Sequence, residues 1–368
     1  MSARFDAVVV GAGLAGAATA RRLVAGGMRV ALLDRERGPT DKVCGEFVSG
    51  EAAADLADAG IDLARMGASR LTGMRLAAGG AEAEAPLPFP AWGLSRRRLD
   101  AALREAAVGA GADLRLGVAV REIGPGGVTL AGGECLACAR IVLATGKHDL
   151  RAHPRRLPGG RRGGMIGFKL HLRLTQAQAA ALGPRVELHL YPGGYAGLQP
   201  IEAGLVNLSL VIDAARFAQA GRSFEGVLAA VAPPGSRLGA RLSGHEPSWP
   251  RPLAIASIPY GYRLWRAPEG PPWLWPVGDQ AAVTPSFTGD GMALALASAE
   301  VTARAMLAGG TPAECRATLR ARLGRQMAAA SAIAAPMRVP ALHRSIVRAL
   351  ARVPAAASGL AWATRLAA

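Results

Sequence analysis

Two short apolar runs, Ala7 to Val10 and Val30 to Leu33, stand on either side of an Ala-rich segment that ends near Ala25. Brief runs of Val and Leu bounded by glycine are typical of buried parallel strands, and a longer Ala-rich segment is typical of a helix. Gly26 and Gly27 follow as candidates for the helix C-cap. The pattern predicts a strand, a helix and a parallel strand at the start of the chain.

Further strand–turn–helix patterns recur along the chain. Residues 141–151 (IVLATGKHDLR) predict a buried strand that ends in a Thr-Gly turn, and residues 274–292 (LWPVGDQAAVTPSFTGDGM) predict a strand, a Gly-Asp pair and a loop. A helix is expected to start near Gly291. Residues 94–107 (LSRRRLDAALREAA) predict another helix, with Ser95 as its N-cap.

The middle of the chain has a different periodicity, in which apolar and polar residues alternate. The alternation covers residues 167–174, 186–191 and 203–212, and more weakly 253–258, so it predicts an antiparallel sheet. An Arg-, Pro- and Gly-rich stretch at 150–165 predicts a surface crossover into that sheet. Beyond about residue 312 the pattern is helical and apolar, broken by Pro336, Pro340 and Pro354.

Composition narrows the function classes. The 368 residues carry a net charge of +16, but the excess Arg is dispersed and no nucleic-acid motif is present, so we predict no nucleic-acid partner. No uncharged apolar run reaches the ~18 residues of a spanning helix, and no secretory signal precedes the first strand, which favours a cytoplasmic protein. Cys135 and Cys138 form a lone C-x-x-C without two further ligands at matching spacing, so no metal site is predicted.

The first turn carries a nucleotide-binding pattern. Gly11, Gly13 and Gly16 follow the first strand in G-x-G-x-x-G spacing, and Asp34 follows the second strand. The glycines allow a tight turn, a close approach of the backbone to a pyrophosphate and close helix–strand packing. The helix N-terminus attracts the phosphate, and the carboxylate accepts hydrogen bonds from ribose hydroxyls. The sequence predicts a dinucleotide site but does not by itself separate FAD from NAD.

Together these segments resemble the FAD-binding superfamily of single-component aromatic hydroxylases, flavin halogenases and geranylgeranyl reductases, over at least residues 5–310. The resemblance implies that Gly278 and Asp279 bind the ribityl chain and that Pro285 lies by the isoalloxazine. It implies that Gly289, Gly291 and Met292 face the pyrimidine edge, and that Arg96 reaches the ADP half. Its further implied FAD contacts are Leu14, Ala15, Arg35, Cys44, Gly45, Val120, Thr145 and Gly146.

Two segments resemble geranylgeranyl reductase-like proteins more closely. KVCGEFVSG (42–50) looks like their K-x-C-G-E segment, whose Cys lies near the flavin, and YPGGYAGLQP (191–200) looks like their substrate-wall segment. Cys44 is the candidate acid of a reductase or a small packing residue, and Glu46 is a weaker candidate for a flavin or substrate contact. Tyr191, Tyr195, His171 and His189 are candidates for polarising a phenol, although structural roles are favoured for both histidines. The catalytic candidates are Cys44, Tyr191, Tyr195 and Pro285.

The expected fold class is α/β, with a Rossmann-type FAD-binding domain resembling that of glutathione reductase, an inserted antiparallel-sheet substrate domain and a C-terminal helical segment. The FAD-binding domain is expected to be discontinuous, at residues 1–75, 94–150 and 256–311. The substrate domain is assigned to 76–93 and 151–255, and a helical cap to 312–368. The basic C-terminal helices are expected either to pack as a cap with a solvated face or to make a weak contact with the inner face of the membrane.

The resemblance leaves three functions open. The leading one is a monooxygenase of secondary metabolism that uses NAD(P)H and O2 to hydroxylate a hydrophobic phenolic or polyketide-derived substrate. The alternative is a geranylgeranyl reductase-like flavoprotein that reduces carbon–carbon double bonds of a prenyl chain. The second alternative is a flavin-binding protein without turnover. The expected cofactors are FAD, with NAD(P)H as reductant, and the expected partner is a hydrophobic small molecule.

Overall fold

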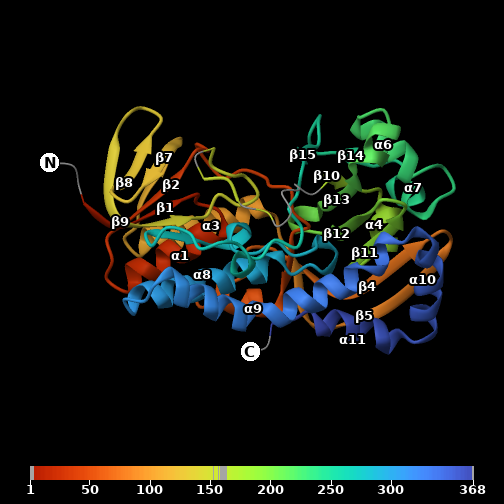
Figure 1. Ribbon diagram of the computed structural model, residues 1–368. Helices are drawn as coiled ribbons and strands as arrows, with labels where there is room; N and C mark the ends of the chain where they lie inside the picture. Colours follow the sequence, from red (N-terminus) through yellow and green to blue (C-terminus); the bar gives the residue numbers. More distant parts are fainter. Residues whose placement is uncertain (1–3, 152, 156, 158–163, 367–368) are drawn as a thin grey trace.

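The computed structural model describes residues 4–151, 153–155, 157 and 164–366, and folds them into two β-sheets with helices packed on both (Figure 1). Part of the expected crossover at 150–165 therefore lies outside the described residues. The first sheet has the strand order β6-β2-β1-β9-β8-β7, with β16 added beside β9. Its strands are β1 (Phe5–Val10), β2 (Val30–Asp34), β6 (Asp113–Leu116), β7 (Val120–Gly124), β8 (Gly127–Leu130), β9 (Cys135–Leu143) and β16 (Leu274–Pro276).

The strands around β1 are parallel, as the apolar runs predict. β1 pairs in parallel with both β2 and β9, and β9 pairs in parallel with β16. The carboxyl ends of these strands therefore meet at one edge, where α/β sheets bind their ligands. β7 and β8 form an antiparallel hairpin that continues into β9.

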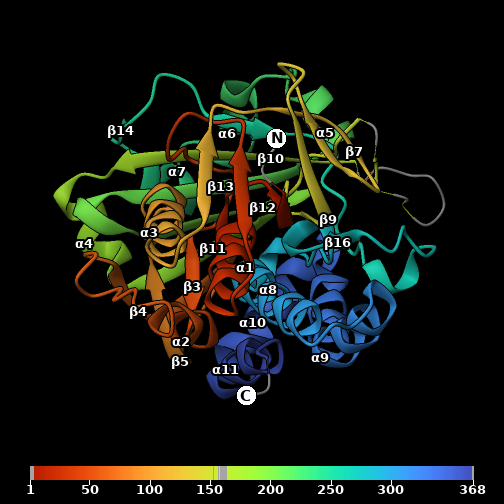
Figure 2. The same cartoon turned by 90° about the vertical axis from the view of Figure 1, so that its left-hand side faces the viewer.

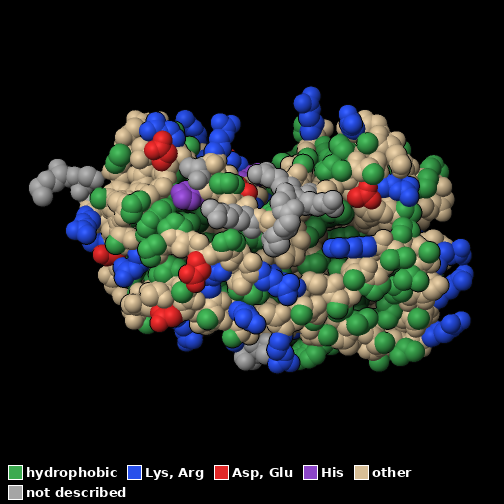
Figure 3. Space-filling model, viewed as in Figure 1, with side chains coloured by type: hydrophobic (Ala, Val, Ile, Leu, Met, Phe, Trp, Pro, Cys, Tyr) green, Lys and Arg blue, Asp and Glu red, His purple; other side chains and the backbone are tan. Residues whose placement is uncertain are grey.

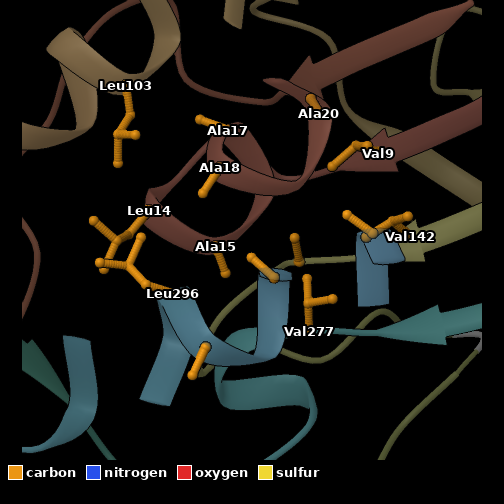
Figure 4. Packing of buried hydrophobic residues seen from close by; sticks show 14 of the residues in the cluster. Val9, Leu14, Ala15, Ala17, Ala18, Ala20, Leu103, Val142, Val277 and Leu296 are labelled. Carbon is orange, nitrogen blue, oxygen red and sulfur yellow. The ribbon is translucent and has the colours of Figure 1, made fainter. Parts of the chain in front are cut away.

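Small residues let three helices pack closely beside this sheet. They are α1 (Leu14–Ala25), α3 (Arg96–Gly109) and α8 (Gly291–Leu307). The short α2 (Gly50–Ala57) packs against α8. Figure 4 shows Leu14 and Ala15 of α1 facing Leu296 of α8 and Val277, with little side-chain volume between the backbones. Ser95 caps α3 by accepting a hydrogen bond from the Arg98 amide, which confirms the predicted N-cap.

The second sheet has the strand order β14-β10-β13-β12-β11-β4-β5-β3, with β15 beside β10. The predicted alternating segments form β10 (Met165–Arg173), β11 (Arg185–Tyr191), β13 (Val206–Asp213) and β15 (Leu253–Ile255). The sequence patterns gave no strand for β3 (Phe47–Ser49), β4 (Ser69–Ala78), β5 (Ala81–Gly93), β12 (Gly194–Pro200) and β14 (Glu246–Pro247). Because β4 begins at Ser69, the assigned boundary between residues 75 and 76 divides one strand.

Helices cover both faces of the second sheet (Figures 1 and 2). One face packs against α4 (Gln176–Leu182), α5 (Ala214–Gln219), α6 (Phe224–Val231) and α7 (Arg237–Leu242). On the other face, α10 (His343–Arg352) and α11 (Pro354–Ala363) lie against β5 and follow the long α9 (Pro312–Ala334). This confirms the predicted helical C-terminal segment.

Short 3-10 turns link these elements at Glu202–Gly204, Leu264–Arg266, Gly278–Gln280, Ser286–Thr288, Pro336–Arg338 and Pro340–Leu342. Among the described helices, none combines the length and the apolar character needed to cross a membrane.

Candidate active site

The three motif glycines have different physical tasks. Gly11 has φ +105°, and a Cβ there would lie 2.5 Å from the Ala144 carbonyl oxygen. A Cβ on Gly16 would lie 1.8 Å from the Gly11 carbonyl oxygen. A Cβ on Gly13 would meet nothing closer than 3.7 Å. Gly11 and Gly16 are thus required by the protein's own packing, whereas the space at Gly13 is left for something else.

That space fits the pyrophosphate of FAD. Gly13 is the N-cap of α1, and no side chain accepts a hydrogen bond from the first amides of this helix. Free amides and the positive end of the helix dipole form an anion site. A side chain at Gly13 would fill this cradle. The geometry therefore suits the role that the G-x-G-x-x-G pattern predicts for Gly13, and contacts of Leu14 and Ala15 with the cofactor stay predictions.

Asp34 ends β2 beside this cradle, but its carboxylate also binds protein groups. One oxygen accepts a hydrogen bond from the Ala12 amide at 2.9 Å. The same oxygen forms an ion pair with Arg104, whose Nη2 lies 2.8 Å away. The other accepts from the Glu36 amide at 3.0 Å. Arg104, whose Nε donates to the Ala12 carbonyl at 2.6 Å, was not identified from the sequence. Its eight-residue distance from Arg96, two helical turns, is the signal that would have placed both on one face of α3.

Arg96 lies next to the same helix start. A Cβ on Gly13 would be 3.7 Å from its Nη2, and its guanidinium makes two bonds to Asp100, at 2.9 and 3.0 Å. Burial lowers the pKa of Arg96, but Asp100 and the Cys44 sulfur outweigh that effect and raise it. A fixed cation beside the cradle suits the ADP phosphates. Contact with the ADP half stays a prediction.

The ends of β9 and β16 are tied together by a side chain that the sequence reasoning missed. The Gln280 amide nitrogen donates to Thr145 Oγ1 at 3.0 Å, to the Gly146 carbonyl at 2.9 Å and to the His148 carbonyl at 3.0 Å. Gln280 is 1% exposed, so these bonds are shielded from water. The two turns predicted to face the flavin are therefore held as one rigid unit.

Lys147 follows the Thr-Gly turn and reaches Asp279, with Nζ 3.2 Å from the carboxylate. Burial lowers the pKa of Lys147, but the charge of Asp279 outweighs it and raises the pKa overall. Both side chains line the cavity described below. Lys147 was not identified from the sequence, although it directly follows a turn at the carboxyl end of a central strand.

The start of α8 carries a buried ion pair. Asp290 is fully buried between Gly289 and Gly291, and it binds Arg365 of the C-terminal segment. Burial raises the pKa of Asp290 to about 6, against the opposing effect of Arg365. Gly291 has no atom near the position of a Cβ, so the helix start is open on that side. This pair joins the predicted pyrimidine edge to the end of the chain.

A cavity of about 570 Å³ extends from these residues between the second sheet and the C-terminal helices. Cys44, Gly45, Lys147, Asp279 and Gly289 line one part of it. Apolar side chains from β4, β5, β11 and the helices line most of the rest, among them Met74, Leu76, Leu87, Phe89, Val186, Leu188, Ile346, Leu350 and Leu360. The cavity thus joins the predicted flavin site to a long apolar compartment.

Three hydroxyl groups form a polar cluster in this cavity. Tyr195 and Tyr260 each share a hydrogen bond with Ser286, which lies next to Pro285. Burial raises the pKa of both tyrosines, so both hydroxyls are protonated at neutral pH. Pro285 is itself buried and does not line the cavity, and its place beside the isoalloxazine stays a prediction. Tyr260 and Ser286 were not identified from the sequence.

Tyr191 does not belong to the site, which corrects its assignment as a catalytic residue. Its hydroxyl donates to the Tyr195 carbonyl at 2.9 Å and to the Val211 carbonyl at 3.1 Å, and its ring packs in the core on the opposite face of the sheet. Tyr195 pairs with Leu190 across the hairpin, so it shares that residue's face and not that of Tyr191.

Both histidine candidates bind buried carboxylates of the protein, which agrees with the structural roles favoured from the sequence. His171 Nε2 lies 2.7 Å from Glu46, and His189 Nε2 lies 3.0 Å from Glu187. Glu46 also binds the buried ammonium of Lys169 and accepts a hydrogen bond from the Arg96 amide at 2.7 Å. Burial raises the pKa of Glu46, but Lys169 and His171 outweigh it and lower the pKa.

Glu46 therefore has both oxygens occupied by protein groups. Asp41, Glu46 and His171 are close enough to share a cation, but the Lys169 ammonium, 3.8 Å from Asp41, already occupies that role. Glu46 fixes the loop that carries Cys44 into the cavity.

The remaining implied contacts lie around the first sheet. Arg35 is exposed and pairs with Glu36 at 3.2 Å, and Val120 is half-buried in β7. Met292 is buried at the start of α8. Their contacts with FAD stay predictions. Cys138 is buried within β9, and burial raises its thiol pKa to about 11, which fits a structural residue.

Comparison with known sequences gives one family and several relatives. Residues 5–198 match the pyridine nucleotide-disulphide oxidoreductase family. A menaquinone reductase of Mycolicibacterium smegmatis is 27% identical over 336 residues, which cover 84% of this chain and 78% of the relative. A menaquinone reductase of Mycobacterium tuberculosis is 30% identical over 227 residues, and the match covers 56% of this chain and about half, 54%, of that relative.

Solved structures share the fold. A flavin-dependent brominase matches with a TM-score of 0.80 at 18% identity, over 98% of this chain and 93% of that one. A geranylgeranyl bacteriochlorophyll reductase-like protein of Thermoplasma acidophilum matches with a TM-score of 0.73 at 17% identity, over 95% and 91%. These solved structures confirm the α/β fold class. The family match over residues 5–198 confirms the expected FAD-binding superfamily: the chain belongs to the pyridine nucleotide-disulphide oxidoreductase family and is an FAD-dependent oxidoreductase.

Proposed function

We propose that this oxidoreductase reduces a carbon–carbon double bond in the prenyl chain of a lipid, such as a prenylated quinone. The observation that carries the proposal is the cavity, which continues from the predicted flavin edge into an apolar compartment walled by β4, β5 and the C-terminal helices. A pocket of this kind binds a long apolar chain through burial of its surface. The name of the menaquinone reductase relatives supports the same substrate class.

The residues of the cavity supply what such a reduction needs from the protein. Bound FAD, reduced by NAD(P)H, supplies the hydride. The apolar walls hold the chain and exclude water. We assign the proton for the second carbon of the double bond to the protonated hydroxyls of Tyr195 and Tyr260, which line the cavity and are joined through Ser286. Cys44 lines the same cavity and is the second candidate for this proton.

The monooxygenase, which the sequence favours, is the second candidate function. It needs polar groups that bind and polarise a phenol, and Tyr191, His171 and His189 are bonded to other protein groups. Tyr195 remains from that set and is joined by Tyr260, so a phenol could still be bound at the hydroxyl cluster. The apolar compartment beyond the cluster, however, favours a chain over a compact aromatic ring.

The test separates the two reactions by their need for oxygen. The holoprotein is reduced under argon and mixed in detergent with a menaquinone that has an unsaturated side chain, and with the analogue whose side chain is saturated. Because the quinone ring can also oxidise the flavin, the readout is the side chain, analysed after the ring has been reoxidised. The reductase is expected to add two hydrogen atoms to the unsaturated side chain and to leave the saturated analogue unchanged. If product forms only after oxygen is admitted and carries a new hydroxyl group, the reductase is wrong.

Tyr195→Phe tests the hydroxyl cluster. Loss of a positioned acid is expected to lower turnover by roughly 10²-fold, because the proton must then come from a poorer donor. Flavin content is expected to stay unchanged. If Tyr195→Phe and the unaltered protein turn over equally, the proton donor is Cys44 or Tyr260. The variants Cys44→Ala and Tyr260→Phe then distinguish these two residues.

A further inference from the structure

The exposed large apolar side chains of this protein are concentrated in one stretch. Five of the seven among the described residues lie between residues 339 and 362, in the turn before α10, at the junction of α10 and α11, and on α11. We call them the C-terminal patch: Val339, Leu342, Val353, Leu360 and Trp362. Trp362 is 60% exposed, the most of the seven. Isolated apolar residues are ordinary on a protein surface, but a cluster with an exposed Trp marks an interaction site.

The charge around the C-terminal patch has one sign. From residue 315 to the end of the chain the sequence contains no Asp or Glu and nine Arg. Arg338, Arg344, Arg348 and Arg352 are exposed in the patch region, and among the described residues none of them forms an ion pair. Figure 3 shows Arg side chains along the edge formed by α10, beside apolar side chains over the C-terminal helices. Such a surface complements an anionic one.

The C-terminal patch is continuous with the cavity. Leu360 lines the cavity and is also 42% exposed, so it lies where the cavity meets the surface. Phe89 lines the cavity as well, and its ring centre is 6.5 Å from that of Trp362. The apolar compartment therefore opens between β5 and α11, onto the most apolar part of the surface.

We propose that the C-terminal patch docks on an anionic lipid bilayer, with Trp362 and its apolar neighbours in the headgroup region and the arginines on acidic headgroups. The cavity then opens into the acyl chains, and a lipid enters without crossing water. This inference rests on the proposed function for its purpose, because it supplies the route by which a long apolar substrate reaches the flavin. An apolar face combined with unpaired arginines is the pattern of interfacial helices.

Vesicle sedimentation tests docking without any substrate. The holoprotein is expected to sediment with vesicles of phosphatidylcholine and phosphatidylglycerol, and to stay in solution with phosphatidylcholine alone. Each reversal, Arg348→Glu or Arg352→Glu, is expected to weaken binding at least ~fivefold. Arg121→Glu, on the exposed hairpin of the first sheet, is the matched control and is expected to bind as the unaltered protein does. Equal binding by all three variants overturns the proposal.

The apolar half of the patch has its own test. Trp362→Asp is expected to weaken vesicle binding about tenfold or more, because a carboxylate replaces the aromatic ring at the interface and is repelled by acidic lipids. Val108→Asp, at another exposed apolar position (47% exposed) on α3, is expected to change nothing. If Trp362→Asp instead converts a dimer into a monomer and leaves vesicle binding unchanged, the patch is a contact between two copies and the proposal is wrong.

Vesicle binding and prenyl reduction in detergent test the docking surface and the proposed function separately. Binding to anionic vesicles with no prenyl reduction in detergent overturns the proposed function and keeps the docking surface. Prenyl reduction in detergent with no vesicle binding overturns the docking surface and keeps the function. Arg348→Glu, which does not line the cavity, is expected to reduce the detergent-dispersed substrate at the unaltered rate and the vesicle-embedded substrate about fivefold or more slowly.

Discussion

The nucleotide end and the second sheet of this protein are held together by different forces. Around α1, the backbone approaches itself so closely that a Cβ at Gly16 would lie 1.8 Å from a carbonyl oxygen, and the core contains many alanines (Figure 4). Around the second sheet, buried carboxylates bind several partners each: Glu46, just before β3, binds Lys169 and His171, and Glu187 binds Arg75 and Arg241. The first region also buries one ion pair, Asp34–Arg104, but its closest contacts are between backbone segments, whereas networks of buried charges characterise the second.

This difference determines how each region responds to change. A packing contact resists added volume and is insensitive to pH. A buried carboxylate tolerates little change in charge, because its cationic partners lose the group that compensates them. The first region should therefore fail when side chains grow, and the second when charges are removed.

The largest effect is expected from Glu187→Gln. Its carboxylate lies 3.0 Å from both Arg75 and Arg241. The change leaves the buried Arg241 without a counter-charge and leaves Arg75 with only the more exposed Glu84. We expect the free energy of unfolding to fall by about 3–5 kcal/mol, measured by urea denaturation. Glu84→Gln removes the other, exposed partner of Arg75 and is expected to cost about 0–1 kcal/mol. Equal losses for the two variants would remove the distinction between the regions.

Acid should act on the same carboxylate. Burial raises the pKa of Glu187, but His189 and Arg241 outweigh it and lower the pKa from 4.5 to about 2. A lowered pKa contributes stability that is complete above the unfolded pKa and is lost as pH falls from 4.5 toward 2. The full shift corresponds to roughly 3 kcal/mol.

The measurement is the urea midpoint as a function of pH, compared between the unaltered protein and Glu187→Gln. The comparison is needed because Asp290, with its pKa raised to about 6, contributes in the opposite direction and gains stability as pH falls through that value. The difference between the two proteins should shrink below pH 4.5. A difference that stays constant with pH would contradict the assignment.

A pair of glycine variants separates packing from cofactor binding in the first region. Gly16→Ala should destabilise the protein by about 1–3 kcal/mol, because its Cβ overlaps a backbone oxygen. Gly13→Ala should leave unfolding of the flavin-stripped protein unchanged and lower the FAD retained on purification. Normal flavin content in Gly13→Ala would show that the cradle does not hold the pyrophosphate.

The smallest effect is expected from Tyr191→Phe. The change removes a buried hydroxyl that donates to two backbone carbonyls, so it should cost about 1 kcal/mol of stability. Turnover should be unchanged, in contrast to Tyr195→Phe. If Tyr191→Phe loses as much turnover as Tyr195→Phe, Tyr191 is a catalytic residue and its exclusion from the site is wrong.

The sequence by itself predicts the first region well. Gly11, Gly13, Gly16 and Asp34 act within one strand–helix–strand unit, so spacing along the chain gives their spacing in three dimensions. Ser95 and the starts of β16 and α8 were found for the same reason, since caps and turns depend on neighbouring residues. The alternating segments likewise predicted the existence of a second sheet.

Only the tertiary structure decides how the second region and the cavity are built. Glu46 meets Lys169 and His171 across more than a hundred residues of sequence, and Arg365 meets Asp290 across 75. Which of Tyr191 and Tyr195 faces the cavity depends on the register of the β11–β12 hairpin, since one position along a strand reverses the face. Such contacts leave no local periodicity, because burial and charge pairing act between segments that only the fold brings together.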